Sequence, residues 1–351
     1  MRGYAHGGDL VTARSRFPGE ILDFSANLNP LGMPEPVRLA ARAAVEESVH
    51  YPDPLCRALA AGIARRDGTT PGQVLCGNGA ADLIFRLAFS RRPGRALVTA
   101  PTFSEYGEAL EAAGWQVVRH HLSPDKGFDL TDDILEDLPG MDLAVLCTPN
   151  NPTGRPIGPE LMDRILDCCR REGVLLMVDE CFLELSDGGE SGGLAGRLAD
   201  FPGLLLLRAF TKSYAIPGLR LGYCLSADER LLDRLSRCAP AWSVSAPAQA
   251  AGLAALGCPD HPAQARALIA RERPRLAAAL SALGLRVWPG AANYLLFRAE
   301  GRYDLKDRLL ERGILIRSCA DYAGLGPDYY RVAVRLPEED RQLIQALSEV
   351  V

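Results

Sequence analysis

The sequence predicts an α/β fold with a large domain around a mostly parallel sheet and a second, smaller α+β domain. Two observations support this prediction. First, short and almost continuously apolar segments alternate with helical patterns through the middle of the chain, as expected for parallel strands covered on both faces. Second, polar residues directly follow these segments, and the carboxyl ends of parallel strands are where ligands bind in such folds.

We expect strands of the large sheet at residues 73–76, 96–100, 142–147, 173–178, 203–207 and 221–225. After about Pro240 the pattern changes to long helices rich in Ala, Leu and Arg. We expect a helix over 262–283, strands near 286–298, 314–318 and 329–334, and a last helix from Pro337. A Gly/Ser-rich stretch, 186–193, is typical of a flexible surface loop.

These patterns divide the chain into three parts. Residues 1–45 form an amino-terminal arm, in which 23–45 packs against the small domain; residues 46–240 form the large domain and 241–351 the small domain. The length of 351 residues suits one large domain with a smaller companion.

The composition favours an enzyme that acts on small molecules. The chain has 39 Lys+Arg against 44 Asp+Glu, and this balance gives no reason to expect binding to nucleic acid or to membranes. No apolar run of about 18 residues is present, and nothing near Met1 is typical of an export signal. The ten cysteines are scattered without metal-ligand spacing, so we expect no metal and a cytoplasmic protein with reduced thiols.

Lys212 is the first candidate for a catalytic residue. It comes shortly after four consecutive leucines, Leu204 to Leu207, which predict a buried strand. A lysine at the mouth of an apolar sheet is partly desolvated, which lowers its pKa and makes the neutral amine available to react with an aldehyde. An isolated lysine after a strand would more often be an ordinary surface residue.

Three other groups of residues follow predicted strands. Asp179 ends one strand, and alone it would be read as a cap for the next turn. Asn151 lies in Asn150-Asn151-Pro152-Thr153-Gly154, a sequence that also makes a good turn. Gly79, Ala80 and Ala81 lie between a strand and a helix, where free backbone N–H groups form an anion site.

Together these residues make the chain resemble the fold-type I pyridoxal-phosphate enzymes of the aspartate aminotransferase superfamily. The resemblance runs from His6 to the last helix. Within the superfamily the sequence is similar to the histidinol-phosphate aminotransferase branch, and in that branch to the lyases that decarboxylate L-threonine O-3-phosphate for cobalamin synthesis. The segments that carry this last similarity are His6-Gly7-Gly8, the D-F-S-A-N-L-N-P-L-G run from Asp23, and Ile314 to Cys319.

The resemblance implies pyridoxal 5'-phosphate as cofactor and assigns the residues around its ring. Lys212 forms the imine with the cofactor, and Asp179 pairs with the pyridine nitrogen, so that the ring can accept electrons from the substrate. Tyr106 stacks on the ring. Asn151 donates to the phenolate oxygen.

The resemblance also assigns the two ends of the site. Backbone groups of Gly79, Ala80 and Ala81 hold the cofactor phosphate together with the side chains of Thr211 and Arg220. Tyr51 reaches this phosphate from the neighbouring subunit, which implies a homodimer. Arg331 clamps the substrate α-carboxylate, and the candidates for other substrate contacts, including the substrate phosphate, are Arg317, Arg335, His6 and Asn29.

The chain departs from the family pattern at three positions. Phe182 stands where many aminotransferases have a tyrosine that donates to the phenolate oxygen, and losing that donor should raise the pKa of the imine. Ala209 replaces a Ser or Thr that often contacts the phosphate, and Asp9 replaces the asparagine common after H-G-G.

Decarboxylation of L-threonine O-3-phosphate to (R)-1-amino-2-propanol O-2-phosphate and CO2 is therefore the expected reaction. An aminotransferase acting on histidinol phosphate or on aromatic amino acids with 2-oxoglutarate is the main alternative. A regulatory domain that retains a cofactor site is disfavoured because no DNA-binding module flanks the pattern. A dinucleotide dehydrogenase is disfavoured because G-N-G-A-A-D lacks the third glycine of G-x-G-x-x-G.

Overall fold

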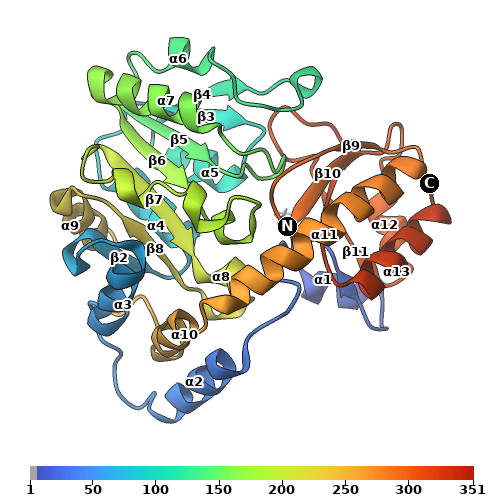
Figure 1. Ribbon diagram of the computed structural model, residues 1–351, viewed down its shortest axis with the longest axis horizontal. Coiled ribbons are helices and arrows are strands. Elements are labelled where there is room, and N and C mark those ends of the chain that lie inside the picture. Colours follow the sequence, from blue (N-terminus) through green and yellow to red (C-terminus); the bar gives the residue numbers. More distant parts are fainter. Residues whose placement is uncertain (1–5) are drawn as a thin grey trace.

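The computed structural model describes residues 6–351, so the first five residues of the predicted arm lie outside it. The large sheet contains β2 (Val74–Gly77), β3 (Arg95–Ala100), β4 (Gln116–His121), β5 (Leu143–Cys147), β6 (Leu175–Asp179), β7 (Leu204–Ala209) and β8 (Gly222–Leu225). Their order is β2-β8-β7-β6-β5-β3-β4, and within this sheet β8 alone runs antiparallel to its neighbours. The predicted α/β fold with a mostly parallel sheet is confirmed (Figure 1).

Helices cover both faces of this sheet (Figure 1). They are α3 (Arg57–Asp67), α4 (Ala80–Phe89), α5 (Ser104–Ala112), α6 (Ile134–Asp137), α7 (Pro159–Glu172), α9 (Glu229–Arg237) and α10 (Ala246–Leu256). A short helix, α8 (Phe210–Ser213), follows β7 directly.

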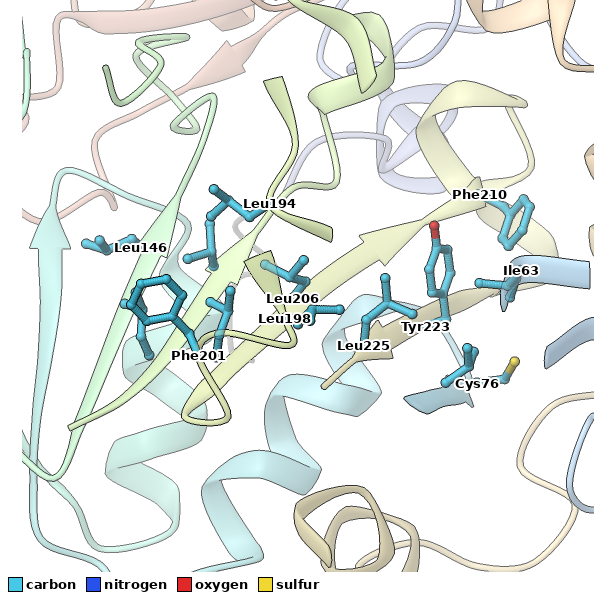
Figure 2. Close-up of a cluster of buried hydrophobic side chains, with 14 of the residues drawn as sticks. Ile63, Cys76, Leu146, Leu194, Leu198, Phe201, Leu206, Phe210, Tyr223 and Leu225 are labelled. Atoms are coloured by element: carbon cyan, nitrogen blue, oxygen red, sulfur yellow. The ribbon is translucent and has the colours of Figure 1, made fainter. Parts of the chain in front are cut away.

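The leucines of β7 show why these segments form strands. Leu204 and Leu206 belong to one buried cluster, and Leu205 and Leu207 belong to the cluster on the opposite face of the sheet. Successive side chains of a strand point to opposite faces, so a strand covered on both sides must be apolar throughout. Figure 2 shows Leu206 within the first cluster, in line with Leu225 and Tyr223 of β8.

Strand β4 was not predicted from the sequence. Its residues, Q-V-V-R-H-H, include four polar side chains, and only His120 among the six is buried. The strand lies at the edge of the sheet and pairs only with β3. An edge strand does not need a continuous apolar run, so the criterion that found the central strands missed it.

The small domain has a four-stranded antiparallel sheet in the order β12-β13-β10-β9, from β9 (Arg286–Trp288), β10 (Tyr294–Arg298), β12 (Arg317–Ser318) and β13 (Tyr329–Ala333). Strand β1 (Leu22–Asp23) pairs in parallel with β11 (Ile314–Leu315). The helices of this part are α1 (Leu10–Arg16), α12 (Leu305–Leu310) and α13 (Pro337–Ser348), and the carboxyl-terminal half of α11 (Asp260–Ala282) joins them. Phe24 is fully buried in the core shared by α11, α12 and α13, and Ala13 of α1 packs on Leu310 and Leu315 in a separate cluster.

The contacts of two helices differ from the expected domain division. Helix α2 (Glu35–Glu46) packs against α10 and places Val37 in the core of the large domain, so the expectation that all of 23–45 packs on the small domain is wrong. Helix α10 places Ala248 and Ala251 in the same core, although it follows residue 240. The change from one core to the other occurs inside α11, where Ile269 packs on Leu185 and Leu276 joins the small-domain core.

The Gly/Ser-rich segment 186–193 is anchored to the large domain, contrary to the expected flexible loop. A Cβ atom on Gly189 would lie 2.6 Å from Arg266 Nη1, and one on Gly193 would lie 2.7 Å from Arg208 Nη2. The backbone N–H of Leu194 donates to Glu180 Oε1 at 2.8 Å. Gly189 and Gly193 therefore allow two arginine side chains to approach the backbone closely.

All ten cysteines are free thiols, and eight of them are buried. Within the described residues, no helix combines the length and the apolar content needed to cross a bilayer.

Replacing Leu206 with Ala should remove about 2–5 kcal/mol from the free energy of unfolding, because the cavity would form in a fully buried part of the sheet. Urea denaturation followed by circular dichroism measures this loss. Val11, whose side chain is 82% exposed, provides the control, since Val11→Ala should change stability by less than about 0.5 kcal/mol. Equal losses in the two variants would contradict the assigned core.

Candidate active site

Lys212 lies in α8, at the carboxyl end of the central strand β7. Desolvation lowers the pKa of its amine to about 8, and the positive charges of Arg331 and Arg220 act in the same direction, whereas Cys181 and Asp179 oppose it. Its Nζ atom lies 5.9 Å from the centre of the Phe182 ring, so the ring face forms one wall of the site. The predicted desolvated lysine is present, with neutral amine available near pH 8.

Asn29 holds the backbone around Lys212. Its N–H donates to the Lys212 carbonyl at 3.0 Å and its Nδ2 donates to the Ser213 carbonyl at 2.7 Å. Its Oδ1 accepts from the Leu31 N–H at 2.8 Å. Both ends of the side chain are thus engaged by backbone groups, which fixes the backbone of Lys212 and Ser213. Contact between Asn29 and substrate stays a prediction.

Asp179 ends β6, the strand next to β7, and is 5% exposed. The Tyr106 hydroxyl donates to its Oδ2 at 2.5 Å, and the Cys181 N–H donates to its Oδ1 at 2.8 Å. Burial raises the pKa of this carboxyl, although the Cys181 and Tyr106 hydrogen bonds act to lower it. A cation placed against Asp179 would relieve the cost of its burial, as the protonated ring nitrogen of the expected cofactor would.

Tyr106 reaches this site from α5 and is almost completely buried. Burial, together with the neighbouring Asp179, raises the pKa of its hydroxyl, which therefore remains a hydrogen-bond donor. The sequence placed Tyr106 near the cofactor ring but did not reveal its bond to Asp179. Stacking on that ring stays a prediction.

Asn151 and Arg331 bind each other, which joins the two domains at the site. Arg331 Nη1 donates to Asn151 Oδ1, and its Nη2 donates to the Ser25 carbonyl at 2.8 Å. The Tyr322 hydroxyl lies 3.4 Å from Asn151 Oδ1. Within residues 6–351, the buried Nε of Arg331 has no hydrogen-bond partner, so a ligand could satisfy it.

The H-G-G segment packs against Ser25, beside Arg331. A Cβ atom on Gly7 would lie 2.1 Å from the Ser25 carbonyl oxygen, so no larger residue fits there without a shift. The Gly8 N–H donates to Ser25 Oγ at 2.8 Å. His6 Nε2 lies 3.2 Å from Glu105 Oε1, which places the imidazole beside the first turn of α5.

Asn27 is a site residue that the sequence analysis missed. Its side chain is 2% exposed, and its Nδ2 and Oδ1 both lack a hydrogen-bond partner within residues 6–351. Two residues before it, Ser25 accepts from Arg331, and two residues after it, Asn29 holds Lys212. A buried amide without partners is costly unless a ligand satisfies it, and no sequence pattern distinguished Asn27 from Asn29.

The two other candidate arginines already have carboxylate partners. Arg317 lies opposite Arg331 in the β12–β13 pairing and donates to Asp321 at 2.6 Å. Arg335 donates to Glu339 at 2.6 Å and to the Asp23 carbonyl at 3.1 Å. Arg317 therefore stands next to the site. Arg335 keeps a buried Nε without a hydrogen-bond partner within residues 6–351, and its contact with substrate stays a prediction.

The predicted phosphate site assembles at the start of α4. Gly79 has φ +84°, and a Cβ atom there would lie 2.5 Å from Arg220 Nη2. The guanidinium of Arg220 therefore lies directly against the turn that exposes the first N–H groups of the helix, Ala80 and Ala81. Thr211, the residue before Lys212, is 5% exposed.

Tyr51 does not line the site of its own chain. Its side chain is 79% exposed and stacks on Trp242 with ring centres 4.5 Å apart. Its role at the phosphate of a neighbouring subunit stays a prediction.

These residues fit pyridoxal phosphate at both ends. At one end, the partly desolvated Lys212 and the buried carboxylate of Asp179 suit the ring of the cofactor. At the other end, the turn at Gly79 combines the start of a helix with the guanidinium of Arg220 and suits the phosphate. This combination matches an aldehyde that carries a ring nitrogen and a phosphate.

Comparisons with known proteins agree with this fit. The model of the family described as aminotransferase class I and II matches residues 19–347. Threonine-phosphate decarboxylase of Salmonella typhimurium is 41% identical over 99% of this chain and 96% of its own. The adenosylcobalamin biosynthesis bifunctional protein CobDQ of Leptospira interrogans is 31% identical over 98% of this chain and 41% of its own. The crystal structure of histidinol-phosphate aminotransferase from Clostridium acetobutylicum has a TM-score of 0.87 and 27% identity, covering 94% of this chain and 99% of its own.

Capture of pyridoxal phosphate by the cofactor-free protein should accelerate with pH through about pH 8, the pKa of Lys212, because only the neutral amine attacks an aldehyde. Stopped-flow absorbance at a series of pH values gives this profile. A midpoint near about 10.4, the ordinary value for lysine, would contradict the assignment. Lys212→Arg should abolish capture, whereas Lys126→Arg, at a lysine whose side chain is 59% exposed, should leave it unchanged.

Proposed function

The chain belongs to the aminotransferase class I and II family, and on that premise we propose that it decarboxylates L-threonine O-3-phosphate with pyridoxal phosphate as cofactor. The products are CO2 and (R)-1-amino-2-propanol O-2-phosphate, and the pathway is cobalamin biosynthesis. The observation that carries this assignment is the 41% identity to threonine-phosphate decarboxylase along almost the whole of both chains. Histidinol-phosphate aminotransferases are also similar along most of the chain, with 36% identity over 97% of it for the enzyme of Roseiflexus castenholzii, and this identity is lower than the 41% to the decarboxylase.

The residues divide the chemistry between the two domains. When bound, pyridoxal phosphate supplies an electron sink for the electrons left at the substrate α-carbon. Asp179 would keep a proton on the ring nitrogen of that cofactor, and the orientation of its carboxylate is fixed by Tyr106 and the Cys181 N–H. Lys212, with its pKa near 8, carries the proton that the α-carbon takes up after CO2 has left.

Arg331 and its neighbours orient the substrate. The Arg331 guanidinium would bind the α-carboxylate and hold it for departure, and the Asn151 amide would donate to the phenolate oxygen of the cofactor. Asn27 has a buried amide without hydrogen-bond partners within residues 6–351, the Gly8 N–H binds Ser25 next to Arg331, and Arg317 stands beside Arg331 on the next strand. We assign the substrate phosphate to this group, with Arg317 exchanging Asp321 for the phosphate.

A second copy of the chain completes the site. The connection between α2 and α3 carries side chains that are unusually exposed for apolar residues, namely Val49 at 82%, Tyr51 at 79% and Leu55 at 66%, and Trp242 lies against Tyr51. This apolar surface supports a homodimer in which Tyr51 reaches the partner's cofactor phosphate. The free thiols support a location in the cytoplasm, where cysteines stay reduced.

The loaded protein should release CO2 and aminopropanol phosphate from L-threonine O-3-phosphate without any keto acid. Histidinol phosphate with 2-oxoglutarate is run in parallel, and glutamate formation there with no CO2 from phosphothreonine would identify an aminotransferase instead.

Arg331→Lys should lower kcat/KM by about a hundredfold or more, because a lysine cannot bind a carboxylate through two parallel hydrogen bonds. Arg14→Lys, at an exposed arginine of α1, is the matched control.

Mixing two inactive variants tests the shared site. Lys212→Ala and Tyr51→Ala subunits should together regain activity, because a mixed dimer would contain one site with Lys212 from one chain and Tyr51 from the other. Activity after denaturation and refolding of the mixture measures this effect. Absence of recovery, with mixed dimers shown to form by mass spectrometry, would place Tyr51 outside the neighbouring site.

A further inference from the structure

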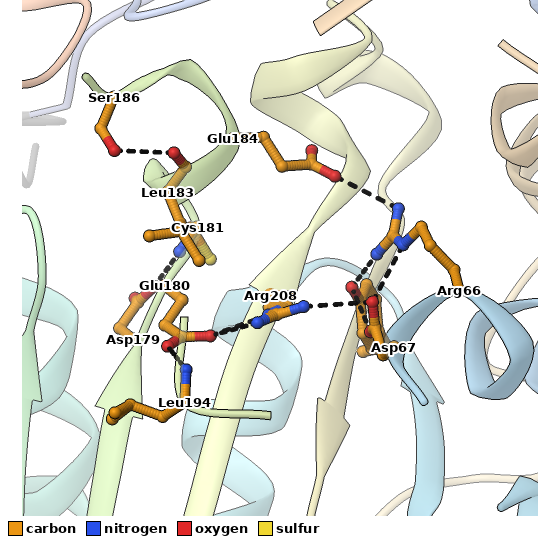
Figure 3. Close-up of polar contacts among 11 residues, drawn as sticks. Arg66, Asp67, Asp179, Glu180, Cys181, Leu183, Glu184, Ser186, Leu194 and Arg208 are labelled. Atoms are coloured by element: carbon orange, nitrogen blue, oxygen red, sulfur yellow. Dashed lines mark hydrogen bonds and ion pairs between the residues drawn. The ribbon is translucent and has the colours of Figure 1, made fainter. Parts of the chain in front are cut away.

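A network of buried and half-buried charged side chains lies behind the site and is not used by the reaction as described. It consists of Arg66 and Asp67 at the end of α3, Glu180 and Glu184 after β6, and Arg208 in β7 (Figure 3). The side chains of Glu180, Asp67 and Arg208 are 0%, 2% and 9% exposed. These charges are therefore shielded from solvent and depend on each other.

Arg208 is at the centre of the network. On one side its Nε and Nη2 donate to Glu180 Oε2 at 2.8 Å and 2.7 Å. On the other side its Nη1 lies 3.1 Å from Asp67 Oδ1. The remaining oxygen of Glu180 accepts from the Leu194 N–H at 2.8 Å, so the carboxylate is satisfied at both oxygens.

The Glu180–Arg208 pair connects the two strand ends that carry the reacting groups. Glu180 directly follows Asp179, and its N–H donates to the Leu207 carbonyl at 2.8 Å. Arg208 comes four residues before Lys212 and one residue after Leu207, the β7 partner of Asp179. Because side chains alternate along a strand, the ion pair links β6 and β7 on the face opposite to the Asp179 carboxylate.

Stability alone is a poor explanation for this pair. Moving two charges out of water costs several kcal/mol each, and apolar residues of similar size often stabilise a core equally well. A pair joined by two hydrogen bonds does, however, fix the relative position of two chain segments, because those bonds are directional. The Glu180–Arg208 pair therefore contributes a fixed position of two chain segments rather than added stability.

We propose that the Glu180–Arg208 pair is a positioning device that sets Asp179 at its working distance from Lys212, across the bound cofactor. The measurement of kcat rests on the proposed function. The measurement of the cofactor's visible absorbance requires only that the cofactor binds. Asp67, which binds the same arginine from the other side, has no direct chain connection to Asp179 and provides a matched control.

The test compares Glu180→Gln with Asp67→Asn in the cofactor-loaded protein. Each change removes one carboxylate from Arg208, and the amide oxygen introduced by Glu180→Gln would still accept from the Leu194 N–H. In Glu180→Gln we expect the pH midpoint of the cofactor's visible absorbance to rise by about half a pH unit or more, since a weaker hold on the ring proton alters the titration of the bound cofactor. We expect kcat to fall about tenfold or more, as misplacement of reacting groups costs rate. Asp67→Asn should lower Tm at least as much but leave the midpoint unshifted and kcat within about twofold of the parent.

The double variant Glu180→Gln with Arg208→Met separates positioning from stability. It leaves no uncompensated arginine charge, so Tm should recover while the shifted midpoint and low kcat persist. The proposal is overturned if Glu180→Gln leaves the midpoint unchanged, if Asp67→Asn shifts it equally, or if the double variant restores it together with Tm. A shifted midpoint in a protein that decarboxylates no phosphothreonine would instead refute the proposed function and leave the positioning role standing.

Discussion

The parallel pairing of β6 with β7 is the constraint on which the rest of the site depends. It aligns Asp179 of β6 with Leu207 of β7. Asp179 and Lys212, which follows β7, therefore lie at the same edge of the sheet. Every other contact is arranged around these two strand ends: Tyr106 and the Cys181 N–H hold the carboxylate, Asn29 holds the backbone of Lys212, and the small domain supplies Arg331. The sheet therefore acts as the reference frame for the reacting groups.

The same burial that stabilises the sheet adjusts the acid–base properties of the site. The alternating leucines of β7 require apolar cover on both faces, and that cover excludes water from the strand ends. Desolvation then lowers the pKa of Lys212 and raises that of Asp179, two opposite shifts from one cause, because burial disfavours the charged form of each group. The packing that holds the sheet together therefore also sets the pKa values of Lys212 and Asp179.

The sequence was most informative where a single strand or turn determines the outcome. Continuous apolar runs located the central strands, and the residues after them located Lys212, Asp179, Asn151 and the turn at Gly79. Prediction failed where distant segments decide. The edge strand β4 lacks an apolar run, Asn27 and Asn29 differ only in the partners that folding gives them, and the buried charges around Arg208 require α3, β6 and β7 to meet.

Helix α11 belongs to two hydrophobic cores at once, and this has a mechanical consequence. Its Ile269 is seated on the large domain and its Leu276 in the small domain, with about two helical turns between them. Pro274 lies between these two anchor points, where a proline removes one backbone hydrogen bond of the helix. The connection between the core that carries Lys212 and the core that carries Arg331 therefore runs through the weakest turn of α11.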